Sequence, residues 1–252
     1  MATHGVAATT VLLAPTTWPW ALGAVAINQL IISGAGMLPR STLLGPNITC
    51  LPAASGERRE VALTIDDGPD SEITPRVLDL LDEADAKATF FCIGHRARRF
   101  PALCREIIAR GHAVENHGDS HSWLFAAFGM GRIRADITAA QSTLASITGR
   151  APRFFRPTAG LRNPLLDPVL FELELQLVAW TRRSFDTRDG NPQRVHARLS
   201  DRLAPRDIIL LHDGDAALTP DGQPIILAVL PHLLASLRKD KLTTVTLSDA
   251  IS

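Results

Sequence analysis

Residues 61–93 read VALTIDDGPDSEITPRVLDLLDEADAKATFFCI, a short β-branched run followed by a helical pattern and a second apolar run. We predict buried strands at residues 61–65 and 88–93, and a helix at residues 74–84, where apolar side chains recur every three or four positions. A strand, a helix and a second strand in this order are typical of a parallel sheet, because the helix carries the chain back to the edge where the first strand began.

The same alternation continues through the rest of the chain. Helical patterns occupy residues 101–110, 133–147, 163–173, 192–203 and 225–238, and they precede strand-like runs at residues 112–115, 153–155, 176–180, 207–212 and 243–247. Seven or so strands that alternate with helices predict an α/β protein with a parallel sheet, either closed as a barrel or open and doubly wound. In both architectures the functional residues collect at the carboxyl ends of the strands.

The composition excludes several classes of protein. Of the 252 residues, 46% are hydrophobic and 21% are charged, which excludes a disordered, collagen-like or disulfide-scaffold protein. The 26 Lys and Arg residues balance the 26 Asp and Glu residues, so no net charge attracts nucleic acid, and we expect no nucleic-acid partner. Three cysteines, an odd number, favour a reducing compartment over a disulfide framework.

The amino-terminal segment is free of charged side chains. Residues 1–39 contain no Asp, Glu, Lys or Arg, and residues 18–38 match the ~20 apolar residues of a membrane-spanning helix. We interpret them as a membrane helix; an interfacial or fold-packed helix and a cleaved signal peptide are the alternatives. Asn28 and Gln29, in the middle of the segment, weaken the membrane interpretation, and a signal peptide would need a basic residue before the apolar run.

Residues 40–60 contain two prolines and two glycines without a sustained period, and we predict a linker to a domain at residues 61–252. Arg40, Arg58 and Arg59 follow the apolar segment. If that segment spans a membrane, the positive-inside rule favours a membrane-associated protein whose main domain lies on the cytoplasmic side.

Polar residues cluster at the carboxyl ends of the predicted strands. They are Asp66 and Asp67 after the first strand, His117 and His121 after the third, Arg156 after the fourth, Asp186 and Asp189 in a later turn, and His212 at the end of the next strand. Each pattern alone has an ordinary interpretation, because an Asp pair before Gly-Pro is typical of a turn and a His pair is common on surfaces. Together, two histidines and one carboxylate form the ligand set of hydrolytic zinc, which lowers the pKa of bound water toward ~7.

Residues 61–121, followed in order by RPTAG (156–160), FDTRDG (185–190) and ILLHDG (209–214), resemble the polysaccharide deacetylases with the NodB homology domain, carbohydrate esterase family 4. The resemblance covers residues 61–252 and implies a distorted (β/α) barrel that removes acetyl groups from amino sugars with a divalent metal, usually zinc. It implies these roles: Asp67, His117 and His121 as metal ligands, Asp66 as catalytic base, His212 as catalytic acid, Arg156 holding Asp66, and Asp186 holding His212. A backbone N–H near Thr158 or Ala159 would bind the oxyanion.

Two motifs depart from the family's pattern. Thr158, Ala159 and Gly160 stand where a Pro-aromatic-Gly sequence is usual, and Gly190 stands where Trp is common. We expect Trp180 and Phe185 to fill part of the space left by the missing tryptophan at position 190, or the substrate groove to be wider. Asp189 is an alternative to Asp186 as the partner of His212.

The function expected from these residues is a metal-dependent deacetylase. Its substrate would be the N-acyl amide of an amino sugar in a cell-envelope polysaccharide or a lipid-linked glycan. A metal phosphoesterase is one alternative, but the ligands of a second metal and a basic phosphate cradle are missing from the motifs. A catalytically silent glycan-binding domain is the other, and the presence of both Asp66 and His212 argues against it.

Overall fold

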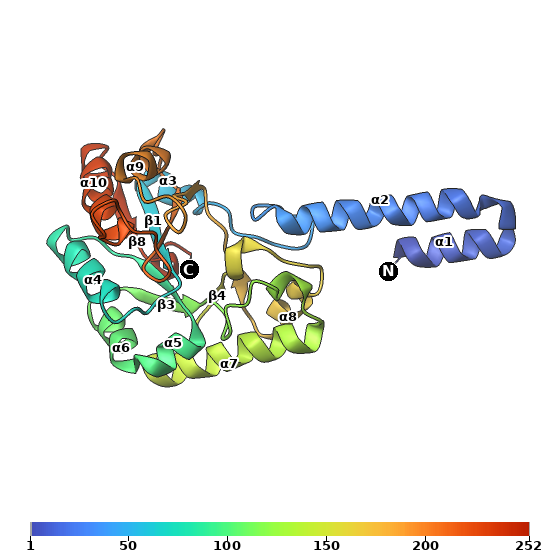
Figure 1. The fold of residues 1–252 in the computed structure, drawn as a ribbon, viewed down its shortest axis with the longest axis horizontal. Helices are drawn as coiled ribbons and strands as arrows, with labels where there is room; N and C mark the ends of the chain where they lie inside the picture. The colour runs from blue at the N-terminus through green and yellow to red at the C-terminus, as the bar shows by residue number, and fades with distance from the viewer. Residues whose placement is uncertain (1, 252) are drawn as a thin grey trace.

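A parallel β-sheet forms the centre of the computed structural model, which describes residues 2–251 (Figure 1). Seven strands lie in the order β5-β4-β3-β2-β1-β7-β6, and β8 pairs with the start of β1. The strands are β1 (Glu60–Asp66), β2 (Thr89–Cys92), β3 (Ala113–Asn116), β4 (Phe154–Phe155), β5 (Gln176–Leu177), β6 (Arg182–Arg183), β7 (Ile208–His212) and β8 (Thr243–Val245). This confirms the predicted α/β fold with a parallel, curled sheet. Strand β6 was not predicted, because it consists of two arginines and has no apolar pattern.

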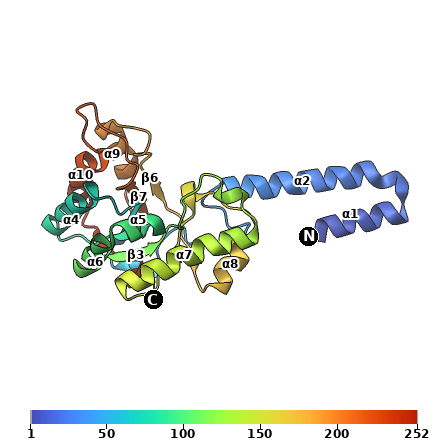
Figure 2. The ribbon, with the colours of Figure 1, turned by 60° about the horizontal axis from the view of Figure 1, so that its bottom comes forward.

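Helices surround the sheet, as Figures 1 and 2 show. Those predicted from periodicity are α4 (Ile73–Glu83), α6 (Pro101–Ala109), α7 (Met130–Thr148), α8 (Leu166–Glu172), α9 (Pro192–Ser200) and α10 (Ile225–Lys239). Shorter elements without a sequence signal are α3 (Ala53–Glu57), α5 (Gly94–Arg99), α11 (Leu247–Ala250), and the 3₁₀ turns η2 (Phe125–Ala127) and η3 (Thr158–Gly160).

The alternation of side chains along β1 separates two cores. Leu63 and Ile65 pack among the helices α4 and α10, whereas Ala62 faces a second cluster that includes Phe91 and Trp180 inside the curled sheet. All residues of β1 after Glu60 are buried. The carboxyl end of β1 therefore belongs to a fully packed strand. This packing fixes the backbone there and holds the side chains at the end of the strand in place.

Residues 48–51 link the β5 edge of the sheet to the start of β7. Ile48 forms a parallel bridge with Val178, next to β5, and the Leu51 N–H donates to the Arg206 carbonyl, just before β7. Leu51 is fully buried. The segment predicted as a linker thus packs into the open side of the sheet.

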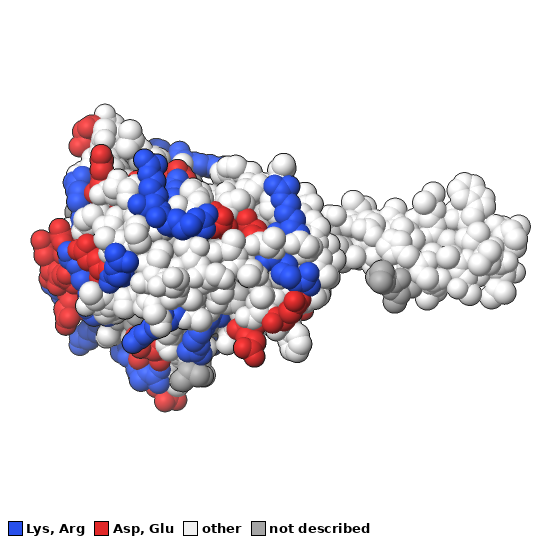
Figure 3. All heavy atoms as spheres, turned by 90° about the horizontal axis from the view of Figure 1, so that it is seen from below, with Lys and Arg blue, Asp and Glu red and all other residues white. Residues whose placement is uncertain are grey.

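The amino-terminal residues form a helical hairpin that projects from the domain (Figures 1 and 2). Helix α1 (Ala2–Leu13) and the turn η1 (Pro15–Thr17) lead into α2 (Trp18–Met37), of which only Ala35 and Gly36 are buried. The sequence predicted a helix at α2 but not at α1. Residues 15–37 are long and apolar enough to cross a membrane, and Figure 3 shows a hairpin surface without charged side chains.

Candidate active site

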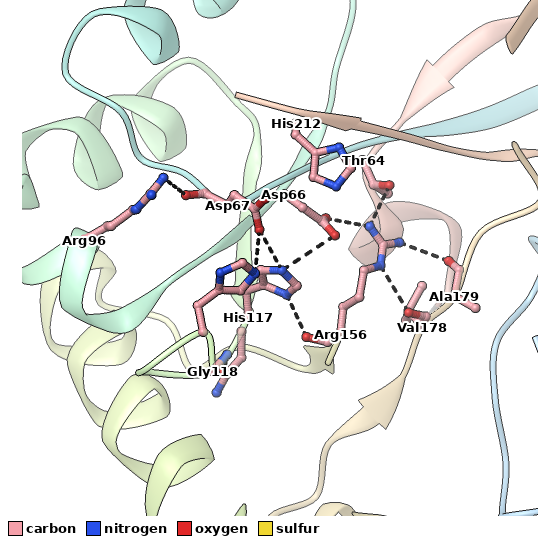
Figure 4. Close-up of polar contacts among 12 residues, drawn as sticks. Thr64, Asp66, Asp67, Arg96, His117, Gly118, Arg156, Val178, Ala179 and His212 are labelled. Atoms are coloured by element: carbon pink, nitrogen blue, oxygen red, sulfur yellow. Dashed lines mark hydrogen bonds and ion pairs between the residues drawn. The ribbon is translucent and has the colours of Figure 1, made fainter. Parts of the chain in front are cut away.

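Asp67, His117 and His121 meet at the carboxyl end of the sheet. Figure 4 shows Asp67 facing His117. The Oδ1 atom of Asp67 lies 3.0 Å from Nε2 of His117 and 3.0 Å from Nε2 of His121. Asp67 follows β1 with a φ of 74°, and Nη1 of Arg96 donates to its carbonyl at 2.8 Å. The backbone thus turns sharply after Asp66, so that the two adjacent carboxylates point to different partners.

The donor set of these three residues fits a divalent cation. Nδ1 of His117 donates to the carbonyl of Arg156 at 2.7 Å, so Nε2 of the neutral ring carries a lone pair. That lone pair faces a carboxylate oxygen of Asp67 at 3.0 Å, and two acceptors this close require a cation or a proton between them. Burial alone would raise the pKa of Asp67, but hydrogen bonds with His117 and His121 hold it well below its usual range. One carboxylate and two imidazoles are a ligand set of catalytic zinc.

Asp66 is held by Arg156, which is completely buried. Nη1 of Arg156 donates to Oδ1 of Asp66 at 2.7 Å and to the Thr64 hydroxyl at 2.9 Å, while its other nitrogens donate to the carbonyls of Val178 and Ala179. The second carboxylate oxygen of Asp66 lies 3.9 Å from Nε2 of His117. Asp66 is therefore an anchored carboxylate beside the three candidate ligands.

His212 and Asp66 lie side by side in the sheet, because they are register partners at the ends of β7 and β1. Its Nδ1 atom is 2.7 Å from Oδ1 of Asp186. Burial disfavours a charge on His212, but the negative charge of Asp186 and the hydrogen bond to it raise the pKa of His212 to about 9. Asp189 instead pairs with Arg194 and Arg198. The geometry selects Asp186 over Asp189 as the partner of His212.

A pocket of about 360 Å³ contains these groups. Its other walls come from Trp123, the η3 turn, Trp180, Arg183, Thr187, Arg188, Leu210 and Asp215. Sequence reasoning missed Trp123 and Arg183, because one lies in an irregular loop and the other in the two-residue strand β6. The Trp123 side chain is 70% exposed, and its ring lies 6.3 Å from that of His121. It offers an aromatic face at the mouth of the pocket, close to His121.

Gly190 has no room for the aromatic side chain that is common at this position. A Cβ atom there would collide with the carbonyl of Leu218. Trp180 and Phe185, expected to fill part of this gap, both lie near Arg183, with ring centroids 5.3 Å and 4.8 Å from its guanidinium carbon. An arginine close to two aromatic rings therefore forms this part of the pocket wall.

Comparisons with known proteins agree with the fold. The family model described as polysaccharide deacetylase matches residues 53–178. A peptidoglycan-N-acetylglucosamine deacetylase of Bacillus cereus is 35% identical over 66% of this chain, and the match spans only 58% of that protein. A chitooligosaccharide deacetylase of Azorhizobium caulinodans is 35% identical over 71% of this chain and 88% of its own length.

A solved structure extends the likeness to three dimensions. The crystal structure of the Bc1960 peptidoglycan N-acetylglucosamine deacetylase superposes with a TM-score of 0.72 at 30% identity, covering 81% of this chain and 92% of that chain. The family model, the related sequences and the solved structure agree. The chain therefore belongs to the polysaccharide deacetylase family, the hydrolases of carbohydrate esterase family 4.

Proposed function

We propose that this protein is a metal-dependent deacetylase that hydrolyses the N-acetyl amide of an amino sugar in a cell-envelope polysaccharide or a lipid-linked glycan. The observation that carries the proposal is the placement of Asp66 and His212 as register partners on β1 and β7, beside the three candidate metal ligands in one pocket. A base and an acid on opposite sides of a bound amide can act on the attacking water and on the leaving amine.

The chain's own residues account for the proton transfers. A divalent cation on Asp67, His117 and His121 would supply positive charge that polarises the amide carbonyl and acidifies water. Asp66, anchored by Arg156, accepts the proton of the attacking water. His212 donates a proton to the nitrogen as the C–N bond breaks, which releases acetate and a free amine. Protonation is needed because an unprotonated amine is a poor leaving group.

The η3 turn is placed to bind the oxyanion of the reaction. The Gly160 and Leu161 amides donate to the carbonyls of Pro157 and Thr158, whereas the Thr158 and Ala159 amides make no such bond within residues 2–251. This turn lines the same pocket as Asp66 and His212. A fixed amide donor at this point would stabilise negative charge on the carbonyl oxygen, and losing such a donor typically costs ~10² to 10³ in rate.

The two other functions have less support. Asp67, His117 and His121 are the one cluster of this kind among the residues that the structure describes, so a two-metal phosphoesterase has no second site there. A silent glycan-binding domain would not need a buried Arg156 to anchor Asp66 nor a buried Asp186 to hold His212.

The proposed function is tested with metal analysis and amine release on the same samples. We expect one equivalent of zinc per chain in the wild type and in Asp66→Asn, and none in His117→Ala. Both variants should lose release of free amine from an N-acetylglucosamine oligomer. His95→Ala, which removes an exposed histidine outside the pocket, is the matched control and should keep zinc and turnover. Full turnover by Asp66→Asn would overturn the assignment of the base.

We also infer that the amino-terminal hairpin anchors the protein in a membrane. At 1.5 Å per residue, the 20 residues of α2 span about 30 Å, the thickness of the hydrocarbon core. Thr3 donates to the side chain of Asn28 at 3.3 Å, and His4 lies 3.1 Å from Gln29. Helix α1 thus provides partners for both polar residues in the middle of α2, as an apolar environment requires.

Membrane fractionation tests this inference. The full chain should sediment with membranes, and a chain that lacks residues 1–33 should stay in the soluble fraction. Recovery of the full chain in the soluble fraction contradicts the anchor. The arginines at positions 40, 58 and 59 favour a cytoplasmic domain, and digestion of the domain by protease added outside intact spheroplasts contradicts that orientation.

A further inference from the structure

Arg183 projects into the active-site pocket from β6. Its neighbour Arg182 lies on the other side of the strand and pairs with Asp207 at 2.9 Å, as expected from the alternation of side chains. The guanidinium carbon of Arg183 lies 5.3 Å from the ring centroid of Trp180 and 4.8 Å from that of Phe185, and its Nε atom is buried without a hydrogen-bond partner. A guanidinium beside two aromatic rings is attracted to their faces while its N–H groups remain free to donate.

The other arginines near the pocket have acidic partners, unlike Arg183 and Arg188. Arg96 pairs with Asp215, Arg156 with Asp66, and both Arg194 and Arg198 with Asp189. Arg183 and Arg188 form no ion pair with any residue between positions 2 and 251, and both line the pocket. Burial and the positive charge of Arg188 lower the pKa of Arg183. The charges of Asp186 and Asp66 act on Arg183 from a distance and raise its pKa, but neither cation is in ion-pair contact with a carboxylate of residues 2–251.

The remaining acidic groups of the pocket are already engaged. Asp66 is neutralised by Arg156, and Asp67 faces His117 and His121. Arg183 and Arg188 therefore line the pocket beside the proposed deacetylation site without a paired carboxylate. Desolvating an unpaired charge is costly, and a bound anion that forms charge-assisted hydrogen bonds offsets that cost.

We propose that Arg183, with Arg188, forms a subsite for a negatively charged substituent on the acetylated sugar, a carboxylate or a phosphate. This proposal rests on the proposed deacetylase function and narrows its substrate to anionic amino sugars. A guanidinium suits both anions, because its fork of N–H groups matches two oxygens of a carboxylate or a phosphate. Arg188 is exposed at the rim of the pocket, where it strengthens the attraction without being enclosed.

Substrate preference is the readout that separates this role from a structural one. We compare kcat/KM for a neutral N-acetylglucosamine oligomer, for a muramic-acid-containing glycan fragment as the carboxylate arm, and for N-acetylglucosamine 1-phosphate as the phosphate arm. In Arg183→Gln, the preference for the anionic over the neutral substrate should fall roughly 10- to 100-fold, as expected for a lost hydrogen bond to a charged group. The anionic substrate whose preference falls in Arg183→Gln identifies whether the subsite binds a carboxylate or a phosphate.

Arg182→Gln is the matched control, because it removes the same charge from the opposite side of β6. It should keep the wild-type preference. An unchanged preference in Arg183→Gln, or an equal loss in both variants, overturns the anion subsite.

A binding measurement separates failure of the subsite from failure of the deacetylase function. Calorimetry with N-acetylglucosamine 1-phosphate and muramic-acid fragments uses zinc-loaded Asp66→Asn protein, which needs no turnover. Adding Arg183→Gln should weaken binding of the responding anion roughly 10- to 100-fold. Equal affinity for both anions with and without Arg183→Gln overturns the subsite. Wild-type protein that releases no amine from any of the three sugars overturns the proposed function instead.

Discussion

The carboxylate of Asp186 holds His212 at two points. Its Oδ1 atom lies 2.7 Å from Nδ1 of the ring, and its Oδ2 atom accepts the backbone N–H of His212 at 2.8 Å. The hydroxyl of Ser184 donates to the same carboxylate at 2.5 Å. Since Nδ1 faces an acceptor, it carries a proton, and Nε2 is the ring nitrogen that exchanges its proton with a substrate.

Asp186→Asn should shift the pH dependence of the reaction. His212 acts as an acid only while protonated, so activity falls as the pH rises through its pKa of about 9. Removing the negative charge of Asp186 lowers that pKa, and the alkaline limb of kcat moves to lower pH. Asp189→Asn is the control in the same turn, because Asp189 pairs with arginines. A pH–rate profile with the same alkaline limb in Asp186→Asn and wild type would contradict this role.

Arg156→Leu should lower both stability and activity. It leaves Asp66 buried without its partner, and breaking a buried ion pair in this way costs about 3–5 kcal/mol in free energy of unfolding. Urea denaturation measures the loss. Arg134→Leu removes an exposed arginine paired with Glu172 and should change the midpoint far less. Equal midpoints for the two variants would show that the buried pair contributes no more than the exposed one.

His112 should make the fold sensitive to acid. It is buried, its Nδ1 atom accepts the Ala88 N–H, and burial together with the charge of Lys87 lowers its pKa to about 4. His112 therefore binds a proton near pH 6.5 in the unfolded chain but stays neutral in the folded chain until about pH 4. Its contribution to the free energy of unfolding is fully present above pH 6.5 and is lost as the pH falls from 6.5 to 4.

The variant His112→Asn keeps a side-chain acceptor and does not titrate. Between pH 7 and 4, its free energy of unfolding should fall by less than that of the wild type, by on the order of 2–3 kcal/mol. Chemical denaturation at a series of pH values measures the difference. Parallel pH curves would show that His112 titrates alike in the folded and unfolded chain.

Gly160→Ala should disturb the pocket wall. Gly160 has a φ of 73°, and a Cβ atom there would lie 2.6 Å from the Trp180 ring and 2.7 Å from Cβ of Pro39. Strain at positive φ alone costs about 1–3 kcal/mol, so the unfolding midpoint and kcat should both fall. Gly131→Ala is the control, because Gly131 lies within α7 with open space around it and gains helix propensity. Equal stability of the two variants would contradict the close packing at Gly160.

The sequence predicted the parts of the fold in which periodicity reflects burial. Strand β1 and helix α4 have apolar residues that recur with the period of their own element, and both formed nearly at the predicted bounds. Helix α1 was missed, because it packs on α2 and the η1 turn and not on the domain core, and its small polar residues give no apolar stripe. Strand β6 is set by pairing with β7, a long-range contact that no local pattern records.

The contrast between local patterns, which could be predicted, and long-range contacts, which could not, also holds for the candidate site. Asp66, Asp67 and His212 follow regular strands, so their meeting at one edge of the sheet could be predicted. The position of Arg183 could not, because it depends on which side of a two-residue strand faces the pocket. The replacement of an aromatic residue by Gly190 was visible in the sequence, but its cause, the Leu218 carbonyl, required coordinates.

The end of α2 is joined to the pocket wall without a flexible spacer. The Arg162 N–H donates to the carbonyl of Gly36, its guanidinium bonds the Ser41 carbonyl, and Pro39 lies against Gly160. The hairpin and the pocket mouth must therefore tilt together. A surface that holds the hairpin would keep the reacting groups at one height and one angle above it. The distance of a glycan strand from that surface, as much as its chemistry, would then decide whether it is modified.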